Sequence, residues 1–505
     1  VALKLARASR SSPMTIASRL VELLPPVDGV EKVAVAAPGF INFTVSSGWL
    51  ARQVDVIINQ DTAYGNVPLG SGKRVQIEFV SVNPTGPLHV GHGRGAVLGS
   101  TLANILTAAG YDVVREYYVN DAGTQIDNFR RSLYVRYQQC FGRDVAMPSE
   151  GYFGTYLVEL AREIASSEGD RFLKMPEDVA LQELGAIGLS RMIGSIRSEL
   201  DRLRVRFDVW FSESELYRGG QWDRVMAVLK SGGHVAQKEN AVWFVSTALG
   251  EDKDNVLVRS NGSPTYFASD VAYHYNKFVE RKFDQVINIW GADHQGHVSR
   301  MKAVVGALGI APERLKIIIT QLVTLRRGQE VVRLSKRSGD IITLAEVMDE
   351  VGVDACRFVF LSRSADSQMD FDLELVKKQS VENPVYYVQY AYARIASILR
   401  LAREQGIDFS DGDVSLLTHD AELALIRQLV KFPELVEAMA ISLEPHHLPH
   451  YAQDLATVFH SFYQQCRVIG ADRMVTKARL KLVMAVRVVL GRVLSLMGMT
   501  APERM

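Results

Sequence analysis

Residues Glu78 to Leu106, EFVSVNPTGPLHVGHGRGAVLGSTLANIL, contain the end of a strand, a Pro/Gly-rich turn and a long helix of small residues. The strand itself is VQIEFV (75–80), and GYDVVREYYV (110–119) predicts a second strand after the helix. Strand, helix and strand at this spacing predict a βαβ unit and therefore a parallel sheet.

The rest of the chain predicts a doubly wound, Rossmann-like α/β core that is split by an insertion. After a mostly helical stretch, apolar runs resume with NVLVRS (255–260), FDQVINIWG (283–291) and LKIIIT (315–320). The final segments are long and amphipathic, as in a helical bundle. The expected units are an N-terminal α+β appendage (1–70), the first half of the core (71–146), the insertion (147–250), the second half (251–375) and the C-terminal bundle (376–505).

Composition is that of an ordinary globular protein. The 505 residues are 47% hydrophobic and 23% charged, and 57 basic side chains balance 57 acidic ones. No apolar run approaches the ~20 residues of a membrane span, and VALKLARASRSS lacks a signal-peptide core. Three distant cysteines argue against zinc and disulfides. We therefore expect a cytoplasmic protein with no membrane segment and no bound structural metal.

His89 and His92 stand three residues apart where the helix after VQIEFV should begin. In open α/β sheets, ligands bind beyond the carboxyl ends of the strands, at helix N-termini. Both imidazoles could donate to phosphate oxygens, and Gly91, Gly93 and Gly95 would let a base or phosphate approach. Helix capping plus ordinary surface histidines explains the spacing equally well. A metal site is disfavoured because helical metal pairs use i, i+4 spacing.

A basic loop could supply the partner of this histidine pair. EVVRLSKRSGDIITL (330–344) contains Arg333, Ser335, Lys336 and Arg337 ahead of a glycine and a helix. Clustered cations on such a loop suit a clamp that closes on a triphosphate. A solvated surface loop is the simpler alternative for the basic residues taken alone.

Together these motifs resemble those of class I aminoacyl-tRNA synthetases, and within that class the arginyl-tRNA synthetase family. HVGH (89–92) resembles the HIGH signature, and RLSKR (333–337) resembles KMSKS with Arg, Leu and Arg in place of Lys, Met and Ser. Lys336 is retained, and Arg333 keeps the charge of the first lysine. The resemblance extends from PGFINF (38–43) to APERM (501–505).

A site for arginine must hold a planar cation, so carboxylates are required. Glu78 and Asp270 are candidates, and Tyr266 would share a helix face with Asp270; a capping or surface role for Asp270 is the alternative. The resemblance implies two arginine-binding segments, and it places a histidine where some relatives have Gln. The arginine-binding residues that it implies are Glu78, Ser81, Asn83, His92, Tyr266, Asp270 and His294.

The resemblance also implies ATP as a substrate, with Mg²⁺ on its phosphates. His89, His92 and Lys336 would stabilise the charge that develops as the L-arginine carboxylate attacks the α-phosphorus. The arginyl group would then pass to the terminal ribose of tRNA-Arg. The ATP-binding residues implied are His89, Gly91, His92, Gly291, Asp293, Ser335 and Lys336.

The C-terminal segment VENPVYYVQYAYARIASILRLA (381–402) combines tyrosines with Arg394, which suits splayed anticodon bases. Core packing of tyrosines at helical spacing is the simpler explanation. The resemblance implies tRNA contacts at Tyr390, Arg394 and Met505, and it makes the N-terminal unit a tRNA-contacting module. From Arg467 onward, eight basic residues face two acidic ones. We expect a monomer.

Two alternatives stay open. Another class I synthetase, for cysteine or glutamate, would share the signatures, although neither zinc-ligand cysteines nor a basic pocket is visible. A non-catalytic tRNA-binding paralogue would not need both histidines and Lys336. The insertion of roughly 100 residues is short for an editing domain.

Overall fold

The computed structural model describes residues 1–332 and 342–505. The signature loop with Arg333, Ser335, Lys336 and Arg337 therefore lies outside the described residues. Within the two described ranges, no helix has both the length and the apolar character needed to cross a membrane.

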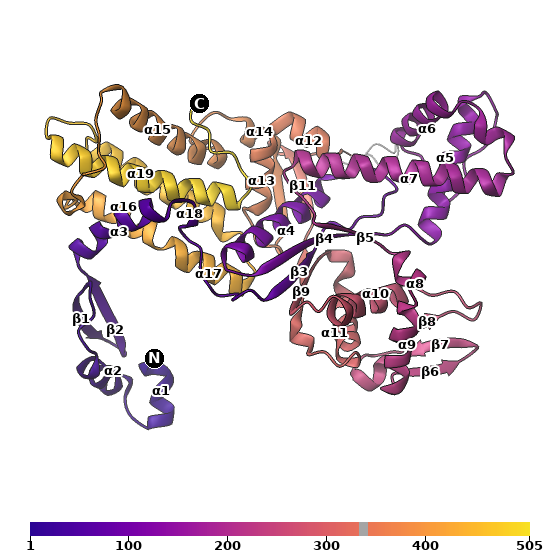
Figure 1. The fold of residues 1–505 in the computed structure, drawn as a ribbon, viewed down its shortest axis with the longest axis horizontal. Coiled ribbons are helices and arrows are strands. Elements are labelled where there is room, and N and C mark those ends of the chain that lie inside the picture. The colour runs from indigo at the N-terminus through magenta and orange to yellow at the C-terminus, as the bar shows by residue number, and fades with distance from the viewer. Residues whose placement is uncertain (333–341) are drawn as a thin grey trace.

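A five-stranded parallel sheet lies at the centre of the chain (Figure 1). Its strands are β3 (Arg74–Glu78), β4 (Asp112–Val119), β5 (Val209–Ser212), β9 (Gln285–Gly291) and β10 (Leu315–Thr320). They run in the order β10-β9-β3-β4-β5, and every neighbouring pair is parallel. Strand β4 lies on one side of β3, and β9, which comes later in the chain, lies on the other side of β3. The order of strands therefore reverses between β3 and β9, which is the switch point of the sheet. The predicted doubly wound core is confirmed.

The central strand and the helix that follows it are almost wholly buried. In β3, every residue from Val75 to Glu78 is buried, as expected for a parallel strand covered on both faces. Helix α4 (Val90–Ala108) packs closely because Gly99 has no side chain; an added Cβ would lie 2.2 Å from the Phe79 ring. The start of α4 is thereby fixed at the carboxyl end of β3.

The structure differs from the predicted insertion in two ways. Strand β5 falls within residues 147–250 but pairs with β4, because its apolar residues complete the sheet. Helix α5 (Thr124–Cys140) precedes that range but shares a separate core with α6 (Thr155–Glu168) and α7 (Glu177–Arg202), at one end of the molecule (Figure 1).

Another apolar core packs against the sheet on the face away from α4. Its helix α10 (Tyr266–Tyr275) carries the predicted site residues Tyr266 and Asp270. This core unites α10 and α11 (Val298–Ala307) with a small antiparallel sheet. The other elements of this region are α8 (Glu215–Arg218), α9 (Gln221–Ser231), β6 (Val235–Lys238), β7 (Ala241–Phe244) and β8 (Asn255–Val258).

The C-terminal region is helical, as predicted. Its helices are α15 (Pro384–Glu404), α16 (Asp420–Val430), α17 (Phe432–Ser442), α18 (His447–Gln465) and α19 (Arg473–Leu496). A mixed region joins it to the core through β11 (Val323–Arg327), β12 (Glu330–Val331), α12 (Leu344–Val351), α13 (Val353–Leu361), β13 (Met369–Asp372) and α14 (Leu373–Lys377).

The predicted N-terminal unit divides into two parts. Helices α1 (Ala2–Ser9) and α2 (Pro13–Leu23) with the hairpin β1 (Val30–Ala36) and β2 (Phe40–Val45) extend away from the other elements (Figure 1). Helix α3 (Ser47–Gln60) instead lies against the C-terminal helices, and Lys481 Nζ is 2.9 Å from Asp55 Oδ1. Residues 1–70 therefore do not form one unit.

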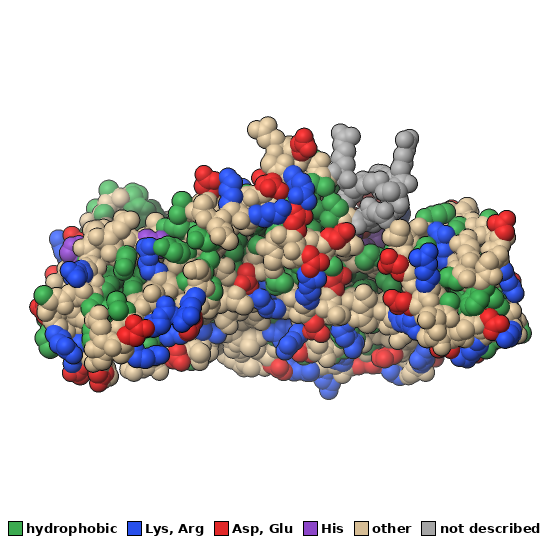
Figure 2. Space-filling view, turned by 90° about the horizontal axis from the view of Figure 1, so that it is seen from above, with side chains coloured by type: hydrophobic (Ala, Val, Ile, Leu, Met, Phe, Trp, Pro, Cys, Tyr) green, Lys and Arg blue, Asp and Glu red, His purple; other side chains and the backbone are tan. Residues whose placement is uncertain are grey.

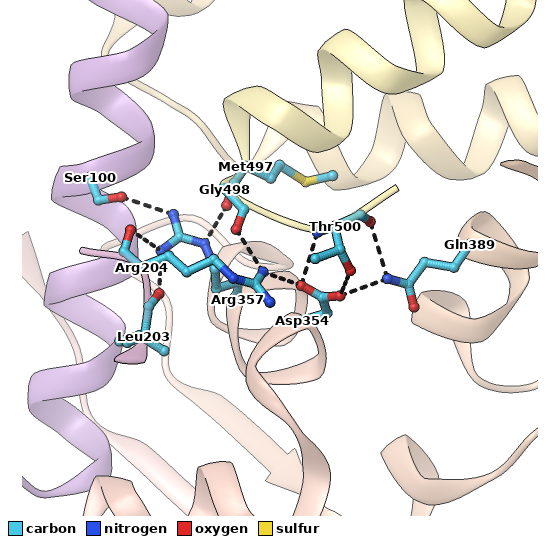
Figure 3. Close-up of polar contacts among 9 residues, drawn as sticks. All are labelled: Ser100, Leu203, Arg204, Asp354, Arg357, Gln389, Met497, Gly498 and Thr500. Carbon is cyan, nitrogen blue, oxygen red and sulfur yellow. Dashed lines mark hydrogen bonds and ion pairs between the residues drawn. The ribbon is translucent and has the colours of Figure 1, made fainter. Parts of the chain in front are cut away.

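Two charged residues of α13, Arg357 and Asp354, join the C-terminal tail to the core (Figure 3). Arg357 is fully buried, and its guanidinium is satisfied by carbonyl and hydroxyl oxygens. Asp354 accepts hydrogen bonds from the tail and from α15. The partners are Met497 O (2.5 Å), Leu203 O (2.8 Å) and Ser100 Oγ (2.8 Å) for Arg357, and Thr500 N (3.1 Å) and Gln389 Nε2 (2.8 Å) for Asp354.

Candidate active site

The two predicted histidines cap the helix that follows β3. His89 is the N-cap of α4, and its Nδ1 accepts from the Gly91 N–H at 3.1 Å. The His89 N–H donates to Nδ1 of His92 at 3.2 Å, and the two rings stack with centroids 3.4 Å apart. A neutral imidazole has one donor and one acceptor nitrogen. The proton of each ring therefore sits on Nε2, which leaves that N–H as a donor.

Both imidazoles are neutral at pH 7. Burial lowers the pKa of His89, and burial together with the neighbouring His89 ring lowers the pKa of His92 to about 3. Neither ring therefore carries a positive charge at neutral pH. They can offer directed hydrogen bonds to an anion at the helix N-terminus.

The glycines of the signature segment have different roles from one another. An added Cβ at Gly93 would lie 2.6 Å from Leu344 Cδ1, so Gly93 allows α12 to pack against α4. This position serves helix packing, which corrects the expectation that Gly93 admits a ligand. A Cβ at Gly91 would lie 3.0 Å from the His89 ring, whereas one at Gly95 would meet open space.

The segment that follows the predicted lysine loop, at Thr343 and Leu344, lies beside the histidine pair. Thr343 forms an isolated antiparallel bridge with His89, and the Leu344 N–H donates to Leu88 O at 2.9 Å. Lys336 and Ser335 lie outside the described residues, but Thr343 is only seven positions beyond Lys336 in the sequence.

Three carboxyl groups from separate elements gather beyond the end of β3. They are Glu78 at the end of β3, Glu213 directly after β5 and Asp270 in α10. Burial raises the pKa of Asp270 to about 7, the charge of Glu78 adds to this effect, and Glu213 contributes as well. Burial also raises the pKa of Glu213. A cluster of three carboxyl groups that are largely shielded from water favours the binding of a cationic ligand.

Two of the predicted arginine-binding residues lie where the chain turns out of β3. Val80 and Ser81 have positive φ values of 68° and 43°, which are uncommon for residues other than glycine. Ser81 Oγ accepts from the Tyr118 N–H at 3.1 Å. The Asn83 side chain donates to Gln125. This turn carries Ser81 and Asn83 between Glu78 and the histidine pair.

Tyr266 lies at the start of α10, four residues before Asp270, as predicted. It is 49% exposed, and a Cβ added to Gly123 would lie 3.1 Å from its hydroxyl oxygen. The half-exposed tyrosine ring therefore lies beside the Gly123 backbone.

The strand beside β3 at the switch point, β9, ends at Gly291, a predicted nucleotide residue. The predicted nucleotide residue Asp293 and the predicted arginine-binding residue His294 follow it. A Cβ on Gly291 would lie 2.6 Å from Asp293 Oδ1. His294 Nε2 is 3.3 Å from Asp293 Oδ2, and both side chains are exposed. Their position beyond the carboxyl end of a parallel strand is the usual place for a ligand.

Several polar residues around the acidic pocket were missed from the sequence. Lys277 is fully buried and binds Glu78, while Arg281 pairs with the buried Glu116. The spacing Asp270, His274, Lys277 could have revealed part of this cluster, because residues four and seven apart share a helix face. Within the described ranges, no group of three or more His, Cys, Asp or Glu side chains is arranged to hold a metal ion.

Comparison with known proteins identifies the family. The model for "tRNA synthetases class I (R), catalytic domain" matches residues 53–385. A curated arginine–tRNA ligase from Dehalococcoides mccartyi is 60% identical over 503 residues, which cover 100% of this chain and 90% of the relative. This chain belongs to the arginyl-tRNA synthetase family. A second relative of that name, from Carboxydothermus hydrogenoformans, is 50% identical and is covered to 91%.

Two further models match the ends of this family member. They are "Arginyl tRNA synthetase N terminal domain" at residues 1–45 and "DALR anticodon binding domain" at residues 388–505. A Campylobacter jejuni structure provisionally described as an arginyl-tRNA synthetase superposes with a TM-score of 0.84, at 31% identity, over 91% of this chain and all of that one.

Two of the predicted tRNA-contacting residues of this arginyl-tRNA synthetase family member, Tyr390 and Arg394, lie together on α15. The Arg394 guanidinium lies over the rings of Tyr390 (4.7 Å) and Tyr463 (4.9 Å). Tyr392 is buried and packs in the core, so not every tyrosine of α15 is available. Figure 2 shows hydrophobic side chains in the left part of the molecule, interspersed with basic and acidic ones. Met505 is 56% exposed and borders a cavity of about 500 Å³ with Tyr386.

Proposed function

We propose that this chain activates L-arginine with ATP and joins it to tRNA-Arg. The observation that carries the proposal is the group of carboxylates Glu78, Asp270 and Glu213 at the end of β3, the strand that precedes the helix capped by His89 and His92. A cationic side chain and a nucleotide triphosphate would be held side by side at the switch point of the sheet. Family membership supports the same reaction.

The arginine side chain would lie in the acidic pocket. Its planar guanidinium presents several N–H donors, and Glu78 and Asp270 are the acceptors we assign to it. Ser81, Asn83, Tyr266 and His294 are proposed as further contacts around it. Lysine would leave some of these acceptors unpaired, which costs much of its binding energy. A glutamate enzyme would need cations where these carboxylates stand.

ATP would lie across the two strands that flank the switch point. His89 and His92 would donate from Nε2 to phosphate oxygens, with Gly91, Gly291 and Asp293 beside the nucleotide. The arginine carboxylate oxygen forms a bond to the α-phosphorus, and pyrophosphate leaves with the electron pair of the broken P–O bond. Charge developing on the phosphate is met by fixed donors, and in our proposal by Ser335 and Lys336. Mg²⁺ would enter as part of the ATP substrate.

Transfer to tRNA completes the proposed reaction. The 2′-hydroxyl of the terminal ribose attacks the arginyl carbonyl, and AMP leaves. Tyr390, Arg394 and Met505 are proposed to contact the anticodon loop, and the N-terminal hairpin unit to contact another part of the tRNA. The expected monomeric state and cytoplasmic location stay predictions.

Charging of purified tRNA-Arg by the purified chain tests the function. We expect attachment of radiolabelled arginine that requires ATP and Mg²⁺, and no attachment of lysine, glutamate or cysteine. Charging with a different amino acid, or with none, would contradict the proposal. Lys336→Ala should depress ATP–pyrophosphate exchange while arginine binding is kept; unchanged exchange would refute the role of Lys336.

A further inference from the structure

A lysine that no sequence motif marks lies beneath the acidic pocket. Lys277 belongs to a π-helical turn, Asn276–Glu280, that continues α10. Its side chain is fully buried, and its Nζ lies 2.6 Å from Glu78 Oε2 and 3.0 Å from Asn288 Oδ1. The same ammonium lies 4.0 Å from the centroid of the Tyr273 ring. Single π-helical turns are frequent at functional sites.

A second row of hydrogen bonds fixes the position of Lys277. His274 Nδ1 donates to the Asp270 carbonyl at 2.8 Å, and Asn288 Nδ2 donates to His274 Nε2 at 2.9 Å. Burial, assisted by the nearby Lys277, lowers the pKa of His274 to about 3, so the ring is neutral and Nε2 can accept. The amide oxygen of Asn288 is thereby turned toward Lys277. The lysine is held in place before any substrate arrives.

Stability alone does not explain this buried ion pair. Removing two charges from water is costly, and apolar residues of similar size often stabilise a core as well or better. The pocket, however, gathers Glu78, Asp270 and Glu213, and like charges oppose each other's ionisation. Lys277 occupies one oxygen of Glu78, whereas no described residue donates a hydrogen bond to the other, Oε1. An acceptor is therefore left for a ligand.

We propose that Lys277 is a positioning residue of the arginine pocket: it holds Glu78 in place and leaves Oε1 of Glu78 for the guanidinium. This inference rests on the proposed function. Lys277 itself makes no contact with the substrate. Selectivity for arginine then depends on the buried ammonium of Lys277, a residue outside the sequence motifs of the pocket.

The pH dependence of arginine binding reports on this arrangement. The tyrosine pKa values near the pocket lie well above 10, and the pKa of His274 is about 3, so these groups do not titrate near pH 7. Lys277 lowers the pKa of Asp270. Its removal should therefore move the titration of the pocket to higher pH. The titratable and charged groups around the two carboxylates are Lys277, Tyr273, His274, Tyr118, Tyr217, Glu213 and Arg300, with Glu116 paired to Arg281 behind them.

The test compares Lys277→Met and Lys277→Arg with Lys230→Met, a control at an exposed lysine of α9. The Michaelis constants for arginine and ATP are measured in tRNA charging from pH 6 to 9, and arginine binding is measured separately by equilibrium dialysis. For Lys277→Met we expect the arginine KM to rise about 10- to 100-fold, the range carried by hydrogen bonds to charged groups. The ATP KM should change little, and the midpoint of the arginine profile should move to higher pH.

Partial rescue in Lys277→Arg would support the role of charge, because it restores the cation. A folded Lys277→Met protein with the arginine KM and pH midpoint of the parent would overturn the proposal, as would equal rises in the arginine and ATP constants. If Lys277→Met does not fold, Lys277→Gln keeps a donor to Glu78 without the charge and is judged by the same criteria. Failure of the parent chain to charge tRNA-Arg would instead refute the proposed function.

Discussion

The rings of His89 and His92 stack face to face, and each ring accepts a backbone N–H of the α4 N-terminus through Nδ1. Capping and catalysis are therefore not alternatives. The hydrogen bonds that complete the helix end also fix the tautomer and direct each Nε2–H away from the helix backbone. The same two residues begin the helix and can present two N–H donors to an anion.

Replacing either histidine with alanine should slow adenylate formation. Loss of one fixed donor to developing charge typically costs ~100- to 1000-fold in kcat, and we expect that range for His89→Ala and His92→Ala. His92→Gln, which keeps an N–H donor, should lose less. ATP–pyrophosphate exchange with tRNA present measures the step. Alanine variants as fast as the parent chain would show that these imidazoles do not act on phosphate.

Arginine binding should weaken as the pH falls below 7. Burial and Glu78 raise the pKa of Asp270 to about 7, so at lower pH this carboxyl is protonated and cannot pair with a guanidinium. The arginine KM should then rise about tenfold per pH unit, since each unit reduces the ionised fraction tenfold. Titration of His92 cannot produce this pH dependence, because the pKa of His92 is about 3.

Asp270→Asn provides the control for that profile. The variant should bind arginine weakly at every pH and show no limb near 7. Because the folded-state pKa of Asp270 is raised, ionisation of this group opposes folding as pH rises from its ordinary value through 7. Asp270→Asn should therefore melt at a higher temperature than the parent at pH 8 without arginine. A lower melting temperature would contradict the assigned pKa direction.

Sequence patterns predicted the parts of the site that are local in the chain. The strand ending at Glu78 and the helix that His89 caps are neighbours in the sequence, so one stretch predicts both. Further strands and helices along the chain then predict the parallel sheet. Lys277 was not predicted because its partner Glu78 is 199 residues away, and nothing in a single sequence states that two such residues meet. Strand β5 was missed for a similar reason, since four apolar-rich residues inside a helical stretch give little periodicity.

Two glycines of α4 offer a matched test of close packing. A Cβ at Gly99 would lie 2.2 Å from the Phe79 ring, whereas a Cβ at Gly95 would meet open space. Gly99→Ala should lower the free energy of unfolding by about 1–3 kcal/mol, the usual cost of overpacking. Gly95→Ala should raise it by up to ~1 kcal/mol through helix propensity. Urea unfolding measures both, and equal effects would contradict the packing seen here.

The buried Arg357 should be needed to hold the C-terminal tail. Arg357→Met would leave the carbonyls of Met497 and Leu203 without donors, at a cost of about 3 kcal/mol. Limited proteolysis should then release the tail beyond residue 497 sooner than in the parent. Arg363→Met, an exposed arginine just after α13, is the control and should behave like the parent. Equal protease resistance in the two variants would refute the attachment role.

Arg394 offers a test of the proposed tRNA-contacting surface that is separate from the proposed arginine pocket. Its guanidinium lies 4.7 Å from the centre of the Tyr390 ring and 4.9 Å from that of the Tyr463 ring, so a stacked base could extend the arrangement. Arg394→Ala should lower kcat/KM for tRNA about tenfold, in line with the loss of one stacking contact. The arginine KM should not change, because Arg394 is on α15 and the acidic pocket is on the central sheet. Arg403→Ala, an exposed change on the same helix, controls for general loss of charge; if both variants lose tRNA affinity equally, the contact is electrostatic and the stacking role of Arg394 is wrong.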